Sequence, residues 1–172
     1  MSDLILNKMA DQRVQYAMDD YKKENNKMGL YAALYGFGRY KLEIKPESGH
    51  NYYLIMEAIF RYYKNNPNSD IDKLYYNTLL LLANTCSNIE TVSMFIRTIS
   101  VQLDYQKRKI CPFNVNINVL LKTFKETIQK NKELIKDSRF INTMNSYNDL
   151  FNEKYGIKIL WTEEELESNS NS

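Results

Sequence analysis

The chain has 172 residues, 44% of them hydrophobic and 26% charged, which is the balance of one folded domain with its own core. Its net charge of +2 is too small to imply a polyanionic partner, and its apolar runs, such as 79–83, are far short of the roughly 20 residues of a membrane span. Only 5 glycines and 3 prolines interrupt the chain, which favours helices over a turn-rich sandwich or barrel.

The first predicted helix starts after Ser2 and ends at the asparagine pair 25–26, because apolar residues recur between them at helical spacing. A second predicted helix runs from Met28 into the stretch 35–41, which reads Y-G-F-G-R-Y-K. The residues expected on one side of the first helix are Leu6, Met9, Arg13, Ala17 and Tyr21.

The stretch 35–41 looks at first like a phosphate loop. A dinucleotide fingerprint needs a strand before it and a third glycine. The RNA-contacting strand of an RRM needs a basic residue where Tyr35 stands and an aromatic one where Arg39 stands. We therefore expect Gly36 or Gly38 to take a positive φ and end the helix, with Arg39 facing solvent.

A third helix is predicted from near Ser48 to the N-N-P stop at 65–67, because proline cannot continue a helix. Ser69 is expected to cap a fourth helix, whose apolar end L-L-L-L-A we place at the centre of the fold. The sequence S-N-I-E predicts a capping box, in which Ser87 and Glu90 satisfy each other's backbone donors at the start of a fifth helix.

A break at C-P-F, 111–113, follows the fifth helix. The next stretch, F-N-V-N-I-N-V at 113–119, alternates so strictly that by itself it predicts a strand. Because asparagine is a good N-cap, we expect instead an extended lead-in and a helix that begins near Asn116. A last long helix follows Ser138, and Gly156 is placed to close it.

Two short segments, 41–45 and 157–161, alternate like strands and could pair with each other. T-E-E-E at 162–165 predicts a capping box for a final turn, and the polar tail 167–172 is expected to be disordered. No internal repeat or linker is visible. The sequence therefore predicts one all-α domain, 1–166, a compact bundle of six to seven helices with at most one small two-stranded β-pair.

Several features indicate a cytoplasmic protein. The N-terminal M-S-D-L-I-L-N-K-M has an acid where a secretory signal has basic residues. Cys86 and Cys111 do not form a C-x-x-C pair, and we expect both to be reduced thiols. The abundance of Asn, Lys, Ile and Tyr points to an A/T-rich gene, as in many mobile elements, phages, large DNA viruses and some parasites.

The sequence contains no motif for catalysis or for a cofactor. His50 is the only histidine, and no second metal-binding side chain stands at ligand spacing from it. G-x-S-x-G is missing, and neither cysteine has the basic or glycine-rich neighbourhood that activates a thiolate. We therefore expect no catalytic residue, no metal, no cofactor and no small-molecule ligand.

Basic residues gather between positions 107 and 139, where they could form a patch for phosphates or for an acidic partner. Glu126, Glu133 and Asp137 are interleaved with them, which is the usual pattern of a solvated helix face, so we expect no nucleic-acid partner. The candidate basic patch comprises Lys107, Arg108, Lys109, Lys125, Lys132 and Lys136.

The 14 tyrosines include doublets at 52–53, 62–63 and 75–76. Adjacent helical residues point about 100° apart, so we expect one ring of each doublet in the core and the other at the rim. Tyrosine and arginine are enriched in protein interfaces, although an A/T-rich gene could also fill helix rims with tyrosine without any such role. The candidate protein-binding residues are Tyr53, Met56, Arg61, Tyr63 and Tyr76.

In size, composition and helicity the chain resembles toxin-immunity proteins and inhibitors encoded by phages and viruses. This resemblance implies a binding protein whose preformed surface covers the active site of a partner. We expect an immunity protein that neutralises a cognate toxin domain. One alternative is a viral helical adaptor similar to the poxvirus Bcl-2-like proteins, although an N-W-G-R-like groove motif is missing here. The other is a nucleic-acid-binding helical protein that uses the basic segment.

Overall fold

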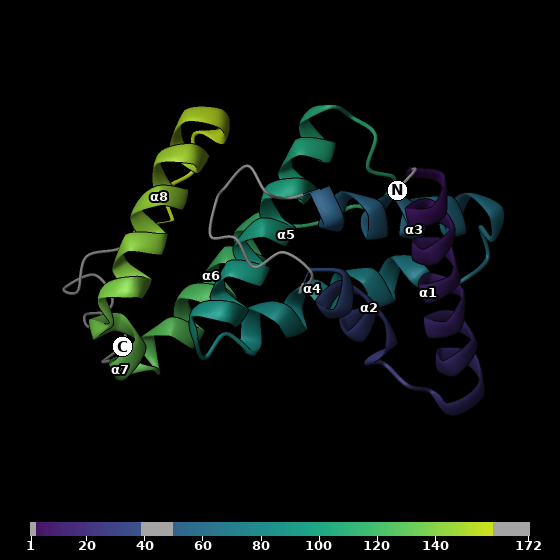
Figure 1. Cartoon of the computed structure of the whole chain (residues 1–172), viewed down its shortest axis with the longest axis horizontal. Helices are drawn as coiled ribbons and strands as arrows, with labels where there is room; N and C mark the ends of the chain where they lie inside the picture. Colours follow the sequence, from purple (N-terminus) through teal and green to yellow (C-terminus); the bar gives the residue numbers. More distant parts are fainter. Residues whose placement is uncertain (1–2, 39–49, 160–172) are drawn as a thin grey trace.

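The computed structural model of the protein describes residues 3–38 and 50–159 (Figure 1). These residues form eight helices and no strand, which confirms the all-α prediction and adds the short α7 to the expected number. In chain order the helices are α1 (Asp3–Glu24), α2 (Gly29–Gly38), α3 (His50–Asn65), α4 (Ile71–Asn84), α5 (Ile89–Lys107), α6 (Ile117–Gln129), α7 (Lys132–Lys136) and α8 (Ser138–Tyr155).

The predicted β-pair is not found in the described residues. Residues 157–159 follow α8 without forming a strand. The Ile159 N–H instead donates to the Asn148 side chain on α8, at 3.0 Å. The segments 41–45 and 160–172, which include the predicted strand partner, final turn and tail, lie outside the described residues.

The helices surround one continuous hydrophobic core. The first three, α1 to α3, pack together at one end of the long axis, and α8 lies at the other end (Figure 1). Between them, α4 contacts α2, α3 and α6, while α5 contacts α3, α4 and α8. Residues 92–99 of α5 are all buried, whereas the run 79–83 of α4 is only partly so. The central helix is therefore α5. The sequence had predicted that α4 would take this place.

Three helix ends lie where asparagine or glycine predicted them. Asn116 caps α6, because its Oδ1 accepts the Val119 N–H at 3.3 Å. Gly156 closes α8 with a φ of 65°, and Asn25, just after α1, has a φ of 54°. The predicted cap at Ser69 is wrong, since its hydroxyl donates to the Asn66 carbonyl and accepts no backbone N–H of α4, which has no side-chain cap.

The capping box before α5 is shifted by one residue from the prediction. The Thr91 N–H donates to Asn88 Oδ1 at 2.9 Å, and the Asn88 N–H donates to Thr91 Oγ1 at 3.2 Å. Glu90 does not pair with Ser87; it accepts the Tyr35 hydroxyl of α2 at 2.7 Å. The acid predicted to cap α5 therefore joins α5 to α2.

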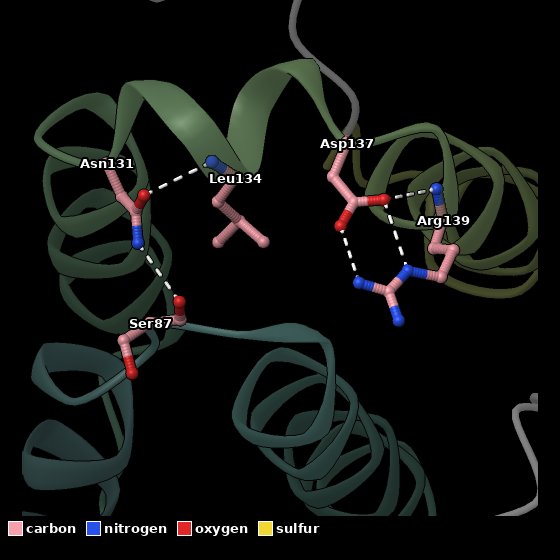
Figure 2. A network of polar contacts seen from close by, with 5 residues as sticks. All are labelled: Ser87, Asn131, Leu134, Asp137 and Arg139. Carbon is pink, nitrogen blue, oxygen red and sulfur yellow. Dashed lines mark hydrogen bonds and ion pairs between the residues drawn. The ribbon is translucent and has the colours of Figure 1, made fainter.

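Two capped turns hold the short α7 in place (Figure 2). Asn131 Oδ1 accepts the Leu134 N–H at 3.1 Å, and its Nδ2 donates to the Ser87 carbonyl at 3.0 Å. At the other end, Asp137 accepts the Arg139 N–H at 2.9 Å and pairs with the Arg139 guanidinium at 2.8 Å. Asn131 thus ties α7 to the corner between α4 and α5.

The glycine stretch differs from the prediction in part. Helix α2 continues through Gly36, which has no positive φ, and ends at Gly38, while Arg39 lies outside the described residues. Gly36 instead makes room for a side chain of α1, because an added Cβ would overlap Arg13 Nη1. The Arg13 guanidinium carbon lies 5.0 Å from the centroid of the Phe37 ring.

Candidate protein-binding surface

The five residues predicted as a protein-binding site do not form one surface. Met56 is completely buried and cannot contact a partner. Arg61 is committed to an ion pair with α1, in which its Nη2 lies 2.7 Å from Asp11 Oδ1. Tyr53 is half-buried, and its hydroxyl bonds to α5.

Tyr53 belongs to a polar cluster that joins α3 to α5. Its hydroxyl donates to Asp104 at 3.0 Å, and the Tyr105 hydroxyl donates to Glu57 at 2.6 Å. Burial and, to a smaller extent, the bond to Asp104 raise the pKa of Tyr53 to about 12. Burial and, to a smaller extent, the bond to Glu57 raise the pKa of Tyr105 well above its usual value. Both phenols therefore remain neutral donors near pH 7, which suits a structural tie.

The other two predicted tyrosines do lie together. Tyr63 and Tyr76 line a shallow pocket of about 590 Å³ where α3, α4 and the loop after α5 meet. Tyr63 packs edge to face on Phe113, with 5.0 Å between the ring centroids. Their neighbours Tyr62 and Tyr75 are buried, which confirms the expected division of these two doublets between core and rim.

The residues of the predicted basic patch lie toward opposite ends of α5. Residues 107–109 are exposed at its C-terminal end. Lys132 and Lys136 are exposed on α7, which Asn131 ties to the other end of α5 (Figure 2). A helix of 19 residues is about 28 Å long, so these groups do not form one patch. Lys125, on α6, is half-buried.

The histidine and the two cysteines do not belong to a metal-binding group in the described residues. His50 is the first residue of α3, and no group of three or more His, Cys, Asp or Glu in 3–38 and 50–159 could hold a metal ion. Cys86 and Cys111 are both free thiols, and burial raises the pKa of Cys86 to about 12, which makes it a poor nucleophile. Within the same ranges, every helix is too short or too polar to cross a membrane.

An apolar surface that the sequence reasoning missed lies between α1 and α2. This α1–α2 groove, of about 550 Å³, is bordered by Met9 and Tyr16 of α1 and by Met28 just before α2. These side chains are 40%, 58% and 49% exposed. With Leu4 and Ile5 of α1, which lie outside the groove, they make up five of the eight large hydrophobic residues exposed in the described part of the chain, so exposed apolar residues are concentrated on α1 and just before α2.

Small residues form the bottom of the α1–α2 groove. Ala17 and Ala33 are buried there, beside Gly29 and Ala32. An added Cβ on Gly29 would lie 3.0 Å from the Cα of Ala17, so the two backbones approach closely at this point. Side chains this short leave a hollow between the longer methionine and tyrosine side chains at the rim.

Two charged residues of α1 also line the α1–α2 groove. Arg13 is half-buried against Phe37, and Asp20 is exposed. In the described part of the chain, no carboxylate pairs with Arg13 and no cation pairs with Asp20. The groove therefore combines apolar side chains with one positive and one negative charge.

Helix α1 carries two apolar stripes. Met9, Arg13 and Ala17, three of the residues expected on one side of the helix, line the open groove. With Ile5 and Tyr16, Met9 belongs to a second apolar stripe that the fold leaves in solvent. The sequence signal was an excess of apolar residues over what one helix face can hold. The fully buried stripe is Ala10, Val14, Ala17 and Met18.

Comparisons with known proteins do not identify a relative of this chain. No protein-family model, no curated protein and no solved structure matches it. Exposed methionine and tyrosine around a bottom of small residues can bind an apolar surface of another protein.

Proposed function

We propose that this protein binds another protein through the α1–α2 groove and inhibits it by covering a functional surface. The gathering of Met9, Tyr16 and Met28 around one groove carries the proposal, because folded monomers rarely leave such side chains together in water. Methionine adapts to irregular surfaces, and tyrosine is enriched in interfaces. Occlusion needs only a preformed surface of this kind.

In its most specific form, the proposal is that the partner is a toxin domain and that the protein acts as an immunity protein in the cytoplasm. Its support is the small all-α fold and the A/T-rich gene. The second candidate is a phage- or virus-encoded helical inhibitor or adaptor of a host protein. A groove between two helices favours it, because such grooves commonly receive amphipathic helices.

The test is co-expression with the product of the neighbouring gene, followed by cell survival and by size-exclusion chromatography of the mixture. We expect the double variant Met9→Glu/Met28→Glu to lose both protection and the complex, because each new carboxylate would be desolvated at the contact. The matched control is Ile141→Glu on α8, whose side chain is 43% exposed and lies outside the groove.

Two results would count against the proposal. A double variant that protects as well as the parent chain would show that the α1–α2 groove is not the inhibitory surface. A neighbourhood without a toxin gene would count against the immunity role in particular, and it would leave the host-protein inhibitor to be tested with the same variants.

A further inference from the structure

The α1–α2 groove carries a charge pattern along one wall. Arg13 and Asp20 both line it, and they are seven residues apart on α1. Seven residues are about two helical turns, so the two side chains face the same way about 10 Å apart along the axis. Tyr16 and Ala17 line the groove between them. The wall thus presents a cation, an apolar middle and an anion.

The Arg13 guanidinium is held beside the groove before any partner binds. It lies over the Phe37 ring and fills the space that a side chain at Gly36 would take. A cation–π contact does not use the N–H donors of the guanidinium in hydrogen bonds, so they remain available to an acceptor. With no carboxylate of the described residues beside it, Arg13 is positioned to meet one from outside.

The exposed stripe of α1 has the spacing of a helix–helix seam. Ile5, Met9, Gln12 and Tyr16 follow one another at intervals of 4, 3 and 4 residues, as the core positions of a heptad do. Three of them are large apolar residues that are at least 40% exposed. Rows of this kind interdigitate with the side chains of a second helix, and the small residues at the bottom let it approach.

We propose that the occupant of the α1–α2 groove is an amphipathic α-helix of the partner protein, with an acidic residue against Arg13 and a basic residue about two turns away against Asp20. This deepens the proposed function and rests on it. Two opposite charges at fixed positions set the direction and the register of the bound helix. The exposed stripe of α1, which runs from Ile5 to Tyr16 past Arg13, supplies the contact area.

A second copy of the chain fits the groove less well. An antiparallel pair of α1 helices that sets Met9 against Tyr16 of the other copy would set Asp20 against Ile5. The register that pairs Arg13 with Asp20 would set Met9 against Glu24. Since α1 cannot match its apolar stripe and its charges in one register, the pattern favours a different helix.

The test uses the full chain with ¹³C-labelled methionine methyl groups. Met9 and Met28 report on the groove, while the buried Met94 and Met144 report on the fold. The probes are three synthetic helices of about 18 residues, roughly 27 Å long, with the same leucine stripe. Two carry Glu and Lys seven residues apart, in opposite orders, and the third carries Gln at both positions.

We expect one charged peptide to shift the Met9 and Met28 signals and to bind at least tenfold more tightly than the glutamine peptide. The double variant Arg13→Gln/Asp20→Asn should remove this advantage and keep the binding of the glutamine peptide. The variant Gly36→Ala, whose new methyl displaces the guanidinium, should reduce the advantage in the same way. Unchanged Met94 and Met144 signals verify that each variant is folded.

Equal binding of the three peptides would overturn the inference. Met9 and Met28 signals that shift with protein concentration alone would also overturn it, because they would indicate that a second copy of the chain occupies the groove. The two proposals fail separately. If Met9→Glu/Met28→Glu abolishes protection while charged and neutral peptides bind alike, only the charged-helix inference fails. If a charged peptide binds as expected while that double variant still protects, the proposed function fails.

Discussion

Replacing Gly29 with alanine is expected to push α1 and α2 apart. The new Cβ would lie 3.0 Å from both the Cα and the Cβ of Ala17 and 3.1 Å from its carbonyl oxygen. Ordinary contacts between carbon atoms are about 3.5–4.0 Å long. Because two of the three atoms belong to the backbone of α1, a side-chain rotation cannot relieve the overlap.

The size of the effect follows from two opposing terms. Overpacking of this kind costs about 1–3 kcal/mol. Alanine is preferred over glycine by at most about 1 kcal/mol inside a helix, and the preference is weaker for Gly29 because it is the first residue of α2. We therefore expect a net loss of about 1–2 kcal/mol. Each kcal/mol should lower the Tm by about 2–4 °C for a chain of this length.

Urea unfolding and thermal melting measure this loss, with Gly36→Ala as the matched control. The added methyl at Gly36 meets only the movable end of the Arg13 side chain, so this variant should be as stable as the parent or up to about 1 kcal/mol more stable. Adding Ala17→Gly to Gly29→Ala should show a coupling of at least about 0.5 kcal/mol. Equal stability of the two single alanine variants would refute the reasoning.

Asn131→Ala should lower the free energy of urea unfolding by about 1–2 kcal/mol, because it removes both the cap of α7 and the bond to the Ser87 carbonyl. Asn131→Asp keeps the cap and should cost less. A greater loss for Asn131→Asp than for Asn131→Ala would contradict these roles. Brief alkylation of the native chain, read by mass spectrometry, should label Cys111 and spare Cys86, whose thiol is buried and has a pKa of about 12. Labelling of Cys86 without unfolding would count against this burial. The pKa of Tyr53 is raised from 10.0 to about 12, so its stabilising contribution is complete below pH 10 and is lost between pH 10 and 12, at up to about 1.4 kcal/mol per pH unit. In Tyr53→Phe the free energy of unfolding should therefore fall less steeply with pH in this range. An unchanged pH dependence would contradict the shift.

Helix ends could be predicted where a local hydrogen bond decides them. Asn116 begins α6 although 113–119 alternates like a strand, because its side chain satisfies a backbone donor that a helix start leaves free. Gly156 closes α8 for a similarly local reason, since it adopts a positive φ without a Cβ clash. Asn88 was missed because Ser87 beside it is an equally good cap, and a tyrosine from α2 engages Glu90.

The candidate surface could not be predicted, because it depends on which side of each helix another helix covers. Met9 and Met56 both stand in helical patterns, yet Met9 is 40% exposed and Met56 is completely buried. The basic residues 107–109 and Lys132 are also separated by tertiary packing, since they lie toward opposite ends of α5. Helical spacing gives the stripe on one helix, and only the assembled fold shows whether that stripe has a partner.

The central place of α5 bears on how the chain folds during synthesis. Phe60 of α3 packs edge to face on Tyr105 of α5, with 5.3 Å between the ring centroids, so a helix made early is covered by one made later. Roughly 40 residues separate the ends of the two helices, Asn65 and Lys107, which corresponds to about 2–8 s of translation. During that interval Phe60 lacks the ring that packs on it in the folded protein. Slower translation across 66–107 would lengthen the interval in which α3 waits for the helix that covers it.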